Sequence, residues 1–407
     1  MNKFLSRTLA VALLLFISAR PVLSQGNTYV LLISYDAFRW DYSGRGITPN
    51  LDKIKAGGVS ALSLRPTFPT KTFPNHISII TGMYPEHHGI VHNSFTNPVT
   101  DDHYRTSNKK AITNGKWYLG ESFWETAEHH GIRTASYFWP GSELTDSARR
   151  PSFTMPFEQN KPYIDRIDAV INWLKMPYKD RPHFISLYIN ATDDVGHSYG
   201  PDSPEINSAI CLEDSLTGIL FGRLKEINMH DSINVIILSD HGMTAVSKDK
   251  AIFIEDIIGP NYKIEGEGPV MMIEPPADKL QDVYIKLKQK ENHYKVYTRD
   301  NIPPHYFFND NPFIYPVIII ADKGWLLTKN RTFFNDKEYL YLGEHGYDNN
   351  ELDMHGIFLA AGPAFKSGYK TGSLWNIDIY PLLCKIFGIV PRQNIDGEIE
   401  RIGFILK

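Results

Sequence analysis

Carboxylate and imidazole side chains follow several apolar runs of the sequence, in spacings that could bind metal ions. They form four groups: a lone Asp, an Asp-x-x-x-His, an Asp-His pair and a late His. The candidates are Asp36, Asp193 with Asp194 beside it, His197, Asp240, His241 and, for the late His, His345 or His355. Each group alone is weak evidence, because a single Asp after a strand is usually a turn or cap and a lone His is usually structural. Together they offer six oxygen and nitrogen ligands without a thiolate, which suits two zinc ions with positions left open for substrate.

A threonine- and proline-rich stretch, RPTFPTKTFPNHISIITG, runs from Arg65 to Gly82. Pro69 and Pro74 lack an amide N–H, so the stretch before the apolar segment is not the interior of a helix or sheet. In one interpretation, its hydroxyls cap the following element. In the other, a rigid elbow presents one hydroxyl as a nucleophile. The predicted metals favour the elbow, because coordination activates a hydroxyl and two metals can clamp an in-line phosphoryl displacement.

The groups of ligands must be positioned by strands that alternate with helices. Apolar, β-rich runs at 28–36, 183–190, 234–242, 315–324 and 356–363 predict strands. Helical patterns occupy 48–58, 121–131, 163–176, 203–227 and 376–389, the first with Thr48 as N-cap and Pro49 at the first helical position. Near-continuous apolar strands with helical crossovers predict an α/β fold with a mostly parallel sheet covered on both faces. Function in such sheets collects at the carboxyl ends of the strands.

Two segments stand apart from this alternation. Residues 1–24 combine Lys3 and Arg7 with an apolar run and small residues at a cleavage spacing, which predicts a secretory signal peptide; an uncleaved anchor is the alternative. Residues 262–329 are rich in Pro and Asn and contain one charged helix, so we expect a small lobe inserted in a catalytic domain of residues 25–407. The mature protein is therefore expected to be periplasmic or secreted, with no membrane span after signal removal.

Charge and cysteine content exclude some classes of protein. The net charge of −4 over 407 residues predicts neither a nucleic-acid-polymer surface nor a basic membrane-binding face. Only Cys211 and Cys384 are present, so disulfides are not the main source of stability. The two cysteines could pair once or remain two buried thiols. The sequence leaves the oligomeric state open.

Six motifs in order resemble the nucleotide pyrophosphatase/phosphodiesterase family of the alkaline phosphatase superfamily. They are PTKTFPNH (69–76), TGMYPEHHGIVHNS (81–94), YFWPGSE (137–143), DDVGHSYGP (193–201), LSDHGM (238–243) and GEHGYDN (343–349). The resemblance covers essentially the whole mature chain. It implies an alkaline-phosphatase-like three-layer α/β/α sandwich and, since the extra modules of larger animal members are missing, a stand-alone catalytic domain of bacterial type.

The resemblance also assigns roles to residues. It implies that Thr72 is the nucleophile, that one metal is held by Asp36, Asp240, His241 and Thr72, and that the second is held by Asp193, His197 and His345. Asn93 corresponds to the side-chain donor to a phosphate oxygen, and Lys71 lies beside the nucleophile as a substrate-binding residue. Phe73 and Phe157 fall where the family sandwiches a nucleobase, although the loop around Phe157 departs from the pattern and core packing is its alternative role.

The chain differs from the family near the metal ligands. Thr192 replaces a usual proline, and Asp194 lies beside Asp193, which the Asp-x-x-x-His spacing favours as the ligand. The activity implied is a two-zinc hydrolase that cleaves phosphodiester or pyrophosphate bonds of small nucleotides, such as nucleoside triphosphates and dinucleotides, through a covalent threonine-bound nucleotidyl intermediate. A phosphomonoesterase or a lipid- or choline-directed phosphodiesterase is the first alternative. A catalytically inactive binding protein is a remote one.

Overall fold

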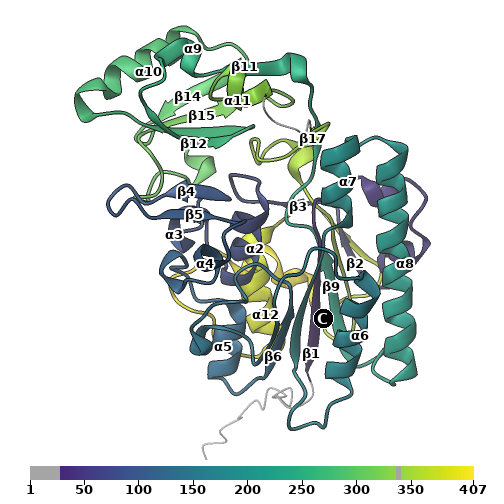
Figure 1. The fold of residues 1–407 in the computed structure, drawn as a ribbon. Coiled ribbons are helices and arrows are strands. Elements are labelled where there is room, and N and C mark those ends of the chain that lie inside the picture. The colour runs from purple at the N-terminus through teal and green to yellow at the C-terminus, as the bar shows by residue number, and fades with distance from the viewer. Residues whose placement is uncertain (1–27, 336–340) are drawn as a thin grey trace, which may run out of the picture.

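The computed structural model describes residues 28–335 and 341–407, and the predicted signal peptide lies outside these residues. The main sheet has eight strands and forms the middle layer of the body (Figure 1). In spatial order they are β19 (Tyr369–Thr371), β2 (Val59–Ala61), β18 (Phe358–Ala361), β9 (Ile233–Leu238), β1 (Tyr29–Tyr35), β8 (Phe184–Ile189), β6 (Thr134–Tyr137) and β7 (Phe153–Met155). β9, β1, β8, β6 and β7 are parallel; the apolar runs predicted β9, β1 and β8, but not β6 or β7.

Helices cover both faces of this sheet because side chains alternate along each strand. On β1, Leu31 and Ile33 point to one face, where α1 (Pro49–Gly57), α6 (Tyr163–Leu174) and α8 (Pro204–Glu226) pack. Val30 and Leu32 point to the other face, where α2 (Thr72–Thr81), α5 (Phe123–His129) and α12 (Ile379–Phe387) pack. The three-layer α/β/α architecture is therefore confirmed (Figure 1).

Two predicted strands pair differently from the parallel expectation. β18 is antiparallel to both β9 and β2. The run 315–324 forms β15 (Val317–Ala321), which belongs to a separate four-stranded antiparallel sheet with β12 (Lys263–Glu267), β13 (Val270–Glu274) and β14 (Tyr294–Thr298). An apolar run identifies a buried strand. The direction of that strand and the sheet it joins depend on the path of the connection that precedes it.

The four-stranded sheet lies above the body in Figure 1, within the stretch 262–329. α10 (Leu280–Gln289) packs on one face through Val283 and Leu287, and Met272 and Ile318 on the other face contact the body. The neighbouring elements are α9 (Glu255–Ile258), β11 (Ala251–Phe253), β16 (Leu326–Thr328) and α11 (Arg331–Asn335). The packing of Met272 and Ile318 fixes this lobe beside the carboxyl ends of the main strands.

The remaining strands and α-helices of the described chain are short. They are β3 (Leu64–Arg65), α3 (Pro85–His88), β4 (Ser94–Thr96), β5 (His103–Arg105), α4 (Lys109–Ile112), α7 (Ala191–Tyr199), β10 (Thr244–Ala245), β17 (Gly343–Glu344) and β20 (Leu374–Trp375). Of the helices in the described ranges, none is both long and apolar enough to cross a bilayer.

Two sequence expectations about single residues are corrected. Thr48 precedes α1 as predicted, but its side chain makes no capping bond; the Asp214 carboxylate of α8 accepts the Leu51 N–H at 2.8 Å instead. Cys211 is exposed on α8 and Cys384 is buried in α12, and both are free. The two cysteines cannot pair because α8 and α12 lie on opposite faces of the sheet.

Candidate active site

Three adjacent parallel strands deliver five of the six predicted ligands to one edge of the sheet. Asp36 follows β1, α7 follows β8 with Asp193 and His197, and Asp240 and His241 follow β9. Because β9, β1 and β8 are neighbours and parallel, their carboxyl ends meet there. His345 follows β17, whose pairing with β10 brings it to the same edge.

Asp36, Asp240 and His241 form one compact cluster. The Nε2 of His241 lies 3.1 Å from Asp240 Oδ2 and 3.4 Å from Asp36 Oδ1, and all three side chains are buried. One potential ligand atom from each residue falls within 4.8 Å of the others. This is the set that the resemblance assigns to one metal.

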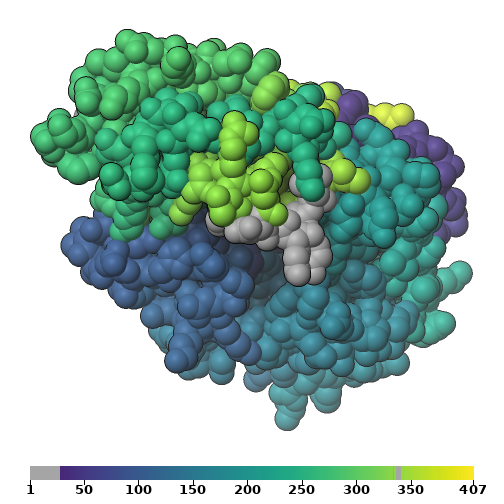
Figure 2. All heavy atoms as spheres, turned by 45° about the horizontal axis from the view of Figure 1, so that its top comes forward, coloured from purple at the N-terminus to yellow at the C-terminus, as the bar shows by residue number. Residues whose placement is uncertain are grey.

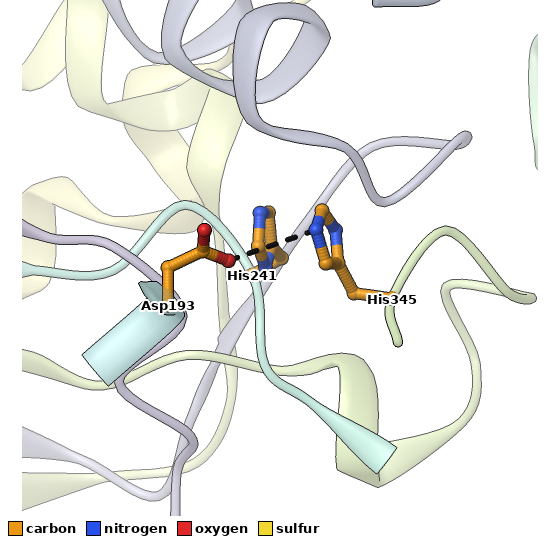
Figure 3. Close-up of side chains that lie close together, drawn as sticks. All are labelled: Asp193, His241 and His345. Carbon is orange, nitrogen blue, oxygen red and sulfur yellow. Dashed lines mark ion pairs between the residues drawn. The ribbon is translucent and has the colours of Figure 1, made fainter. Parts of the chain in front are cut away.

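Asp193, His197 and His345 converge beside that cluster. His345 Nε2 lies 3.7 Å from Asp193 Oδ1 and 3.2 Å from His197 Nε2, and Asp193 Oδ1 lies 3.4 Å from His197 Nε2. Figure 3 shows Asp193 and His345 on either side of His241, whose ring stacks on that of His345 at 3.6 Å between centroids. The two clusters are therefore in direct contact through His241 and His345.

The helical geometry of α7 resolves the choice between Asp193 and Asp194. Asp193 lies four residues before His197, so both side chains occupy one face of the helix. The Asp194 carboxylate is turned away and accepts hydrogen bonds from the amides of Asn190 at 2.6 Å and Gln159 at 3.2 Å. The position of Asp193 thus agrees with the spacing argument.

Hydrogen bonds fix the tautomers of the three histidines. The Nδ1 atoms of His197, His241 and His345 lie 2.8–2.9 Å from the backbone carbonyls of Gly343, Gly242 and Thr70. A carbonyl only accepts, so each Nδ1 carries the proton and each Nε2 presents a lone pair to the cluster. This arrangement orients histidines for metal binding.

Buried carboxylate oxygens supply a second test of the metal hypothesis. Asp36 Oδ1, Asp193 Oδ1 and Asp240 Oδ2 are buried, and none accepts a hydrogen bond within the described chain. Burial, followed by the charges of neighbouring carboxylates, raises the pKa of Asp36 and Asp240, and burial also raises that of Asp193. Three crowded acids with unpaired oxygens need a cation to remain ionised. The residues therefore fit a divalent metal centre.

Thr72 lies at the edge of this cluster as the first residue of α2. Its Oγ1 is 3.2 Å from the unprotonated Nε2 of His241. The capping interpretation of the threonines is wrong for this helix, since the N-cap is Lys71 and makes no side-chain bond. Thr70 instead accepts the Gly346 N–H at 2.8 Å and fixes the segment that carries His345.

Lys71 precedes Thr72 in the chain, and Asn93 contacts the residue that follows it. Asn93 Oδ1 accepts the backbone N–H of Phe73 at 3.1 Å, which leaves the amide NH₂ group of Asn93 as the donor end. The Lys71 ammonium is buried and pairs with Glu344 Oε1 at 2.8 Å. The positive charge of Lys71 at the site is therefore paired with the Glu344 carboxylate.

Phe73 and Phe157 line the same pocket, of about 270 Å³. Phe157 is 43% exposed, so its alternative role as ordinary core packing is wrong. Its backbone N–H donates to Glu143 Oε1 at 2.7 Å, which anchors the loop. The other lining residues are Thr106, Ser107, Ile112, Phe138, Trp139, Pro140, Gly141, Glu143 and Tyr188.

Sequence reasoning missed three residues of the site. The Tyr188 hydroxyl donates to Asp36 Oδ2 at 2.5 Å, and His76 Nδ1 lies 2.9 Å from the Thr72 carbonyl and 3.2 Å from Asp240 Oδ2. Glu344 lies within ligand distance of His197 and His345. Glu344 and His76 lie inside the motifs GEHGYDN and PTKTFPNH, and these motifs could have indicated a role at the site. For Tyr188, the sequence offered only its position near the end of a predicted strand.

Comparisons with known proteins agree with the geometry. A family model described as type I phosphodiesterase/nucleotide pyrophosphatase matches residues 30–348. The chain is 36% identical over 368 residues to bis(5'-adenosyl)-triphosphatase enpp4 of Xenopus laevis, covering 90% of this chain and 79% of that protein. It is 35% identical over 391 residues to ectonucleotide pyrophosphatase/phosphodiesterase family member 1 of Homo sapiens, covering 93% of this chain but only 42% of the human protein.

A solved structure extends the likeness to the whole fold. Murine ectonucleotide pyrophosphatase/phosphodiesterase 5, solved as an inactive threonine-to-alanine variant in complex with AMP, superposes with a TM-score of 0.88 at 31% identity. The match covers 93% of this chain and all of the murine chain. The chain therefore belongs to the type I phosphodiesterase/nucleotide pyrophosphatase family.

Proposed function

We propose that the protein hydrolyses phosphodiester or pyrophosphate bonds of nucleotides. The observation that carries this proposal is the position of Thr72, whose hydroxyl adjoins the buried Asp36–Asp240–His241 cluster while the next residue, Phe73, lines a pocket. A pocket of about 270 Å³ with aromatic walls suits a flat base. Family membership supports the same reaction.

In the proposed reaction, the Oγ1 of Thr72 attacks phosphorus. A P–Oγ bond forms, the bond from phosphorus to the leaving oxygen breaks, and that oxygen departs with the electron pair; the hydroxyl proton is released to solvent. The enzyme then carries a nucleoside monophosphate on Thr72. Water then attacks the same phosphorus: a new P–O bond forms to the water oxygen, the P–Oγ bond breaks, one water proton returns to Thr72 Oγ1, and the nucleoside monophosphate leaves. The Asn93 amide donates to a non-bridging phosphate oxygen, supported by the bond that fixes its other end to Phe73.

We propose two zinc ions as the cofactors. Asp36, Asp240, His241 and the Thr72 hydroxyl would hold one ion, and Asp193, His197 and His345 the other; zinc is favoured because the ligands are carboxylates and imidazoles. When bound, such ions lower the pKa of a hydroxyl and neutralise charge on the phosphate oxygens.

We further propose that residues 25–407 form the catalytic domain with 262–329 as an inserted lobe. The packing of Met272 and Ile318 of the lobe into the same core as Phe95 and Tyr104 supports this division. The composition of residues 1–24 supports a periplasmic or secreted location.

A phosphomonoesterase is the second candidate function. Arg105 lines a cavity together with Asn93, and a monoester needs a cation for its additional phosphate charge.

A turnover panel of the purified chain separates the candidates. The substrates are ATP, a diadenosine polyphosphate, 4-nitrophenyl phosphate and 4-nitrophenyl phosphocholine, each after chelation and with added zinc. We expect AMP to be released from the first two, with much slower turnover of the monoester and the choline ester. Faster turnover of 4-nitrophenyl phosphate would indicate a phosphomonoesterase instead. Faster turnover of 4-nitrophenyl phosphocholine would indicate a choline-directed phosphodiesterase.

A further inference from the structure

Two cavities of different chemistry are lined by the residues before and after Thr72. Phe73 lines the aromatic pocket of about 270 Å³, whereas Lys71 lines a second cavity of about 630 Å³, which we call the polar chamber. Thr106 and Ser107 line both, so the two are adjacent. A substrate whose phosphorus faces Thr72 and whose base enters the aromatic pocket must therefore extend its other substituent toward the polar chamber.

The walls of the polar chamber come from the body, the lobe and the β4–β5 hairpin. Its lining residues are Lys71, His92, Asn93, Ser94, Arg105, Thr106, Ser107, His197, Ile264, Glu265, Gly266, Glu267, Lys329, Tyr341, Glu344 and His345. The face drawn in Figure 2 is hollowed between the blue segment and the teal body, beneath the green lobe. The chamber is predominantly polar, because most of its described lining residues carry charged or polar side chains.

Cations and carboxylates of the chamber are not equally available. Among its three described carboxylates, Glu344 is paired with Lys71, Glu265 accepts the Thr96 hydroxyl at 2.5 Å, and Glu267 likewise has a partner. The side chains of Arg105 and Lys329, by contrast, make no ion pair or hydrogen bond with residues 28–335 or 341–407. Both are therefore available to an anionic ligand.

The β4–β5 hairpin places Arg105 close to the proposed reaction centre. Arg105 pairs with Ser94 across the hairpin, and the Thr106 N–H donates to the Asn93 carbonyl at 3.0 Å. Neighbouring strands lie about 5 Å apart, so the Arg105 backbone is one strand spacing from Ser94, the residue after Asn93. Buried Tyr104 points the opposite way, which fixes Arg105 on the exposed face.

We propose that Arg105 and Lys329, in the polar chamber, bind the phosphates of the leaving group. The inference rests on the proposed function. When the bond from the α-phosphorus breaks, the bridging oxygen leaves with its electron pair as part of a polyphosphate that gains negative charge. Arg and Lys donors match phosphate oxygens. A choline group would need several aromatic faces, and among residues 28–335 and 341–407 the only non-histidine ring in the lining is that of Tyr341.

The test compares two substrates that share adenosine and the scissile phosphate but differ in leaving group. ATP releases pyrophosphate, whereas the 4-nitrophenyl ester of AMP releases nitrophenolate, which carries no phosphate. The variants are Arg105→Gln, Lys329→Gln and the double variant. We expect each single change to lower kcat/KM for ATP by about 5- to 50-fold, the double change to lower it further, and the nitrophenyl ester to change by less than about 2-fold. High salt should shrink the difference in ATP turnover between wild type and variants.

Matched controls lie outside both cavities. Arg150→Gln and Lys290→Gln remove exposed cations of the same types, and neither residue lines the polar chamber or the aromatic pocket. We expect wild-type kinetics on both substrates. A similar loss of ATP turnover in these controls would show that any surface cation attracts ATP to the same extent. It would overturn the assignment of Arg105 and Lys329.

The remaining outcomes each decide a separate question. Equal losses for both substrates in the Arg105 and Lys329 variants, or none for either, would refute a leaving-group site. A loss confined to a monoester such as AMP would instead assign Arg105 to a terminal phosphate. If the wild-type enzyme with zinc cleaves neither substrate, the proposed function itself fails.

Discussion

The hydroxyl of Thr72 lies 3.2 Å from the Nε2 of His241, although 169 positions separate the two residues in the chain. The His241 Nδ1 proton is committed to the Gly242 carbonyl at 2.9 Å, so Nε2 carries a lone pair. His241 and Thr72 therefore present a nitrogen and an oxygen to the same point, next to the unpaired oxygens of Asp36 and Asp240. This contact joins the elbow at the start of α2 to the carboxylate cluster after β1 and β9.

Removing the Thr72 hydroxyl should abolish turnover. We expect Thr72→Ala to lower kcat by at least about 10³-fold, because the proposed covalent step loses its nucleophile, while Thr72→Ser keeps a hydroxyl and part of the rate. Thr81→Ala is the control, since its hydroxyl bonds to the Ile77 carbonyl at the other end of the same helix. Steady-state kinetics and mass spectrometry of the acid-quenched enzyme measure both rate and adduct. An active Thr72→Ala variant would contradict the assignment.

Metal removal should affect stability as well as activity. Chelation leaves three buried carboxylates without a cation, so we expect a lower Tm, restored by zinc, and about two metal ions per chain in the zinc-loaded protein. His345→Ala should lower the metal content to about one ion. His355→Gln is the control, because His355 bonds to Ser63 and Asn349, outside the cluster. Unchanged metal content in His345→Ala would remove His345 from the ligand set.

Tyr188 should act as a positioning residue for metal binding. Its hydroxyl donates to Asp36 Oδ2 at 2.5 Å and leaves Oδ1 facing the cluster. Loss of such an outer contact typically costs 10- to 100-fold in metal affinity, so we expect about that loss in Tyr188→Phe. Tyr35→Phe is a matched control, since Tyr35 lies on the opposite face of the sheet and its hydroxyl bonds to Thr217 at 2.6 Å. Competition titration with a zinc chelator measures both variants, and equal affinities would show that Tyr188 only packs.

Phe157 should contribute to nucleotide affinity rather than to chemistry. Base–aromatic stacking is worth about 1–3 kcal/mol, so we expect Phe157→Ala to raise KM for nucleotide diesters roughly 5- to 100-fold. A small diester without a base, such as bis(4-nitrophenyl) phosphate, should be turned over almost unchanged. Ile219→Ala, which truncates an exposed apolar side chain on α8, is the control for surface changes. Similar losses for both substrates would place Phe157 outside the base pocket.

His88 should make the fold sensitive to acid. Burial lowers the pKa of His88 to about 3, so between pH 6.5 and 3 the unfolded chain binds a proton that the native state does not. Stability therefore rises with pH across this window and is lost on acidification, on the order of 2 kcal/mol between pH 7 and 5. We expect His88→Gln to show a smaller fall in unfolding free energy over that range, measured by urea denaturation. The exposed His230→Gln control should behave like wild type, and an equal slope for His88→Gln would contradict the prediction.

The sequence by itself determined the α/β class, most strand and helix positions, and the identity of the residues that converge. Those predictions succeeded because parallel strands end at a common edge, so Asp36, Asp193 and Asp240 had to meet once their strands were recognised. The Asp-x-x-x-His spacing also selected Asp193, since helical geometry alone puts it on the face of His197.

The tertiary structure alone decided which partners those residues have. Lys71 and Glu344 are far apart in sequence, and their ion pair exists because Thr70 holds Gly346 and Tyr347 against the elbow. The direction of β18 and the separate sheet of β15 likewise depend on how the chain returns, which apolar periodicity does not encode. Apolar periodicity indicates which side chains are buried. The two cavities lined by the neighbours of Thr72 depend instead on how the β4–β5 hairpin, the lobe and the edge of the main sheet pack against one another.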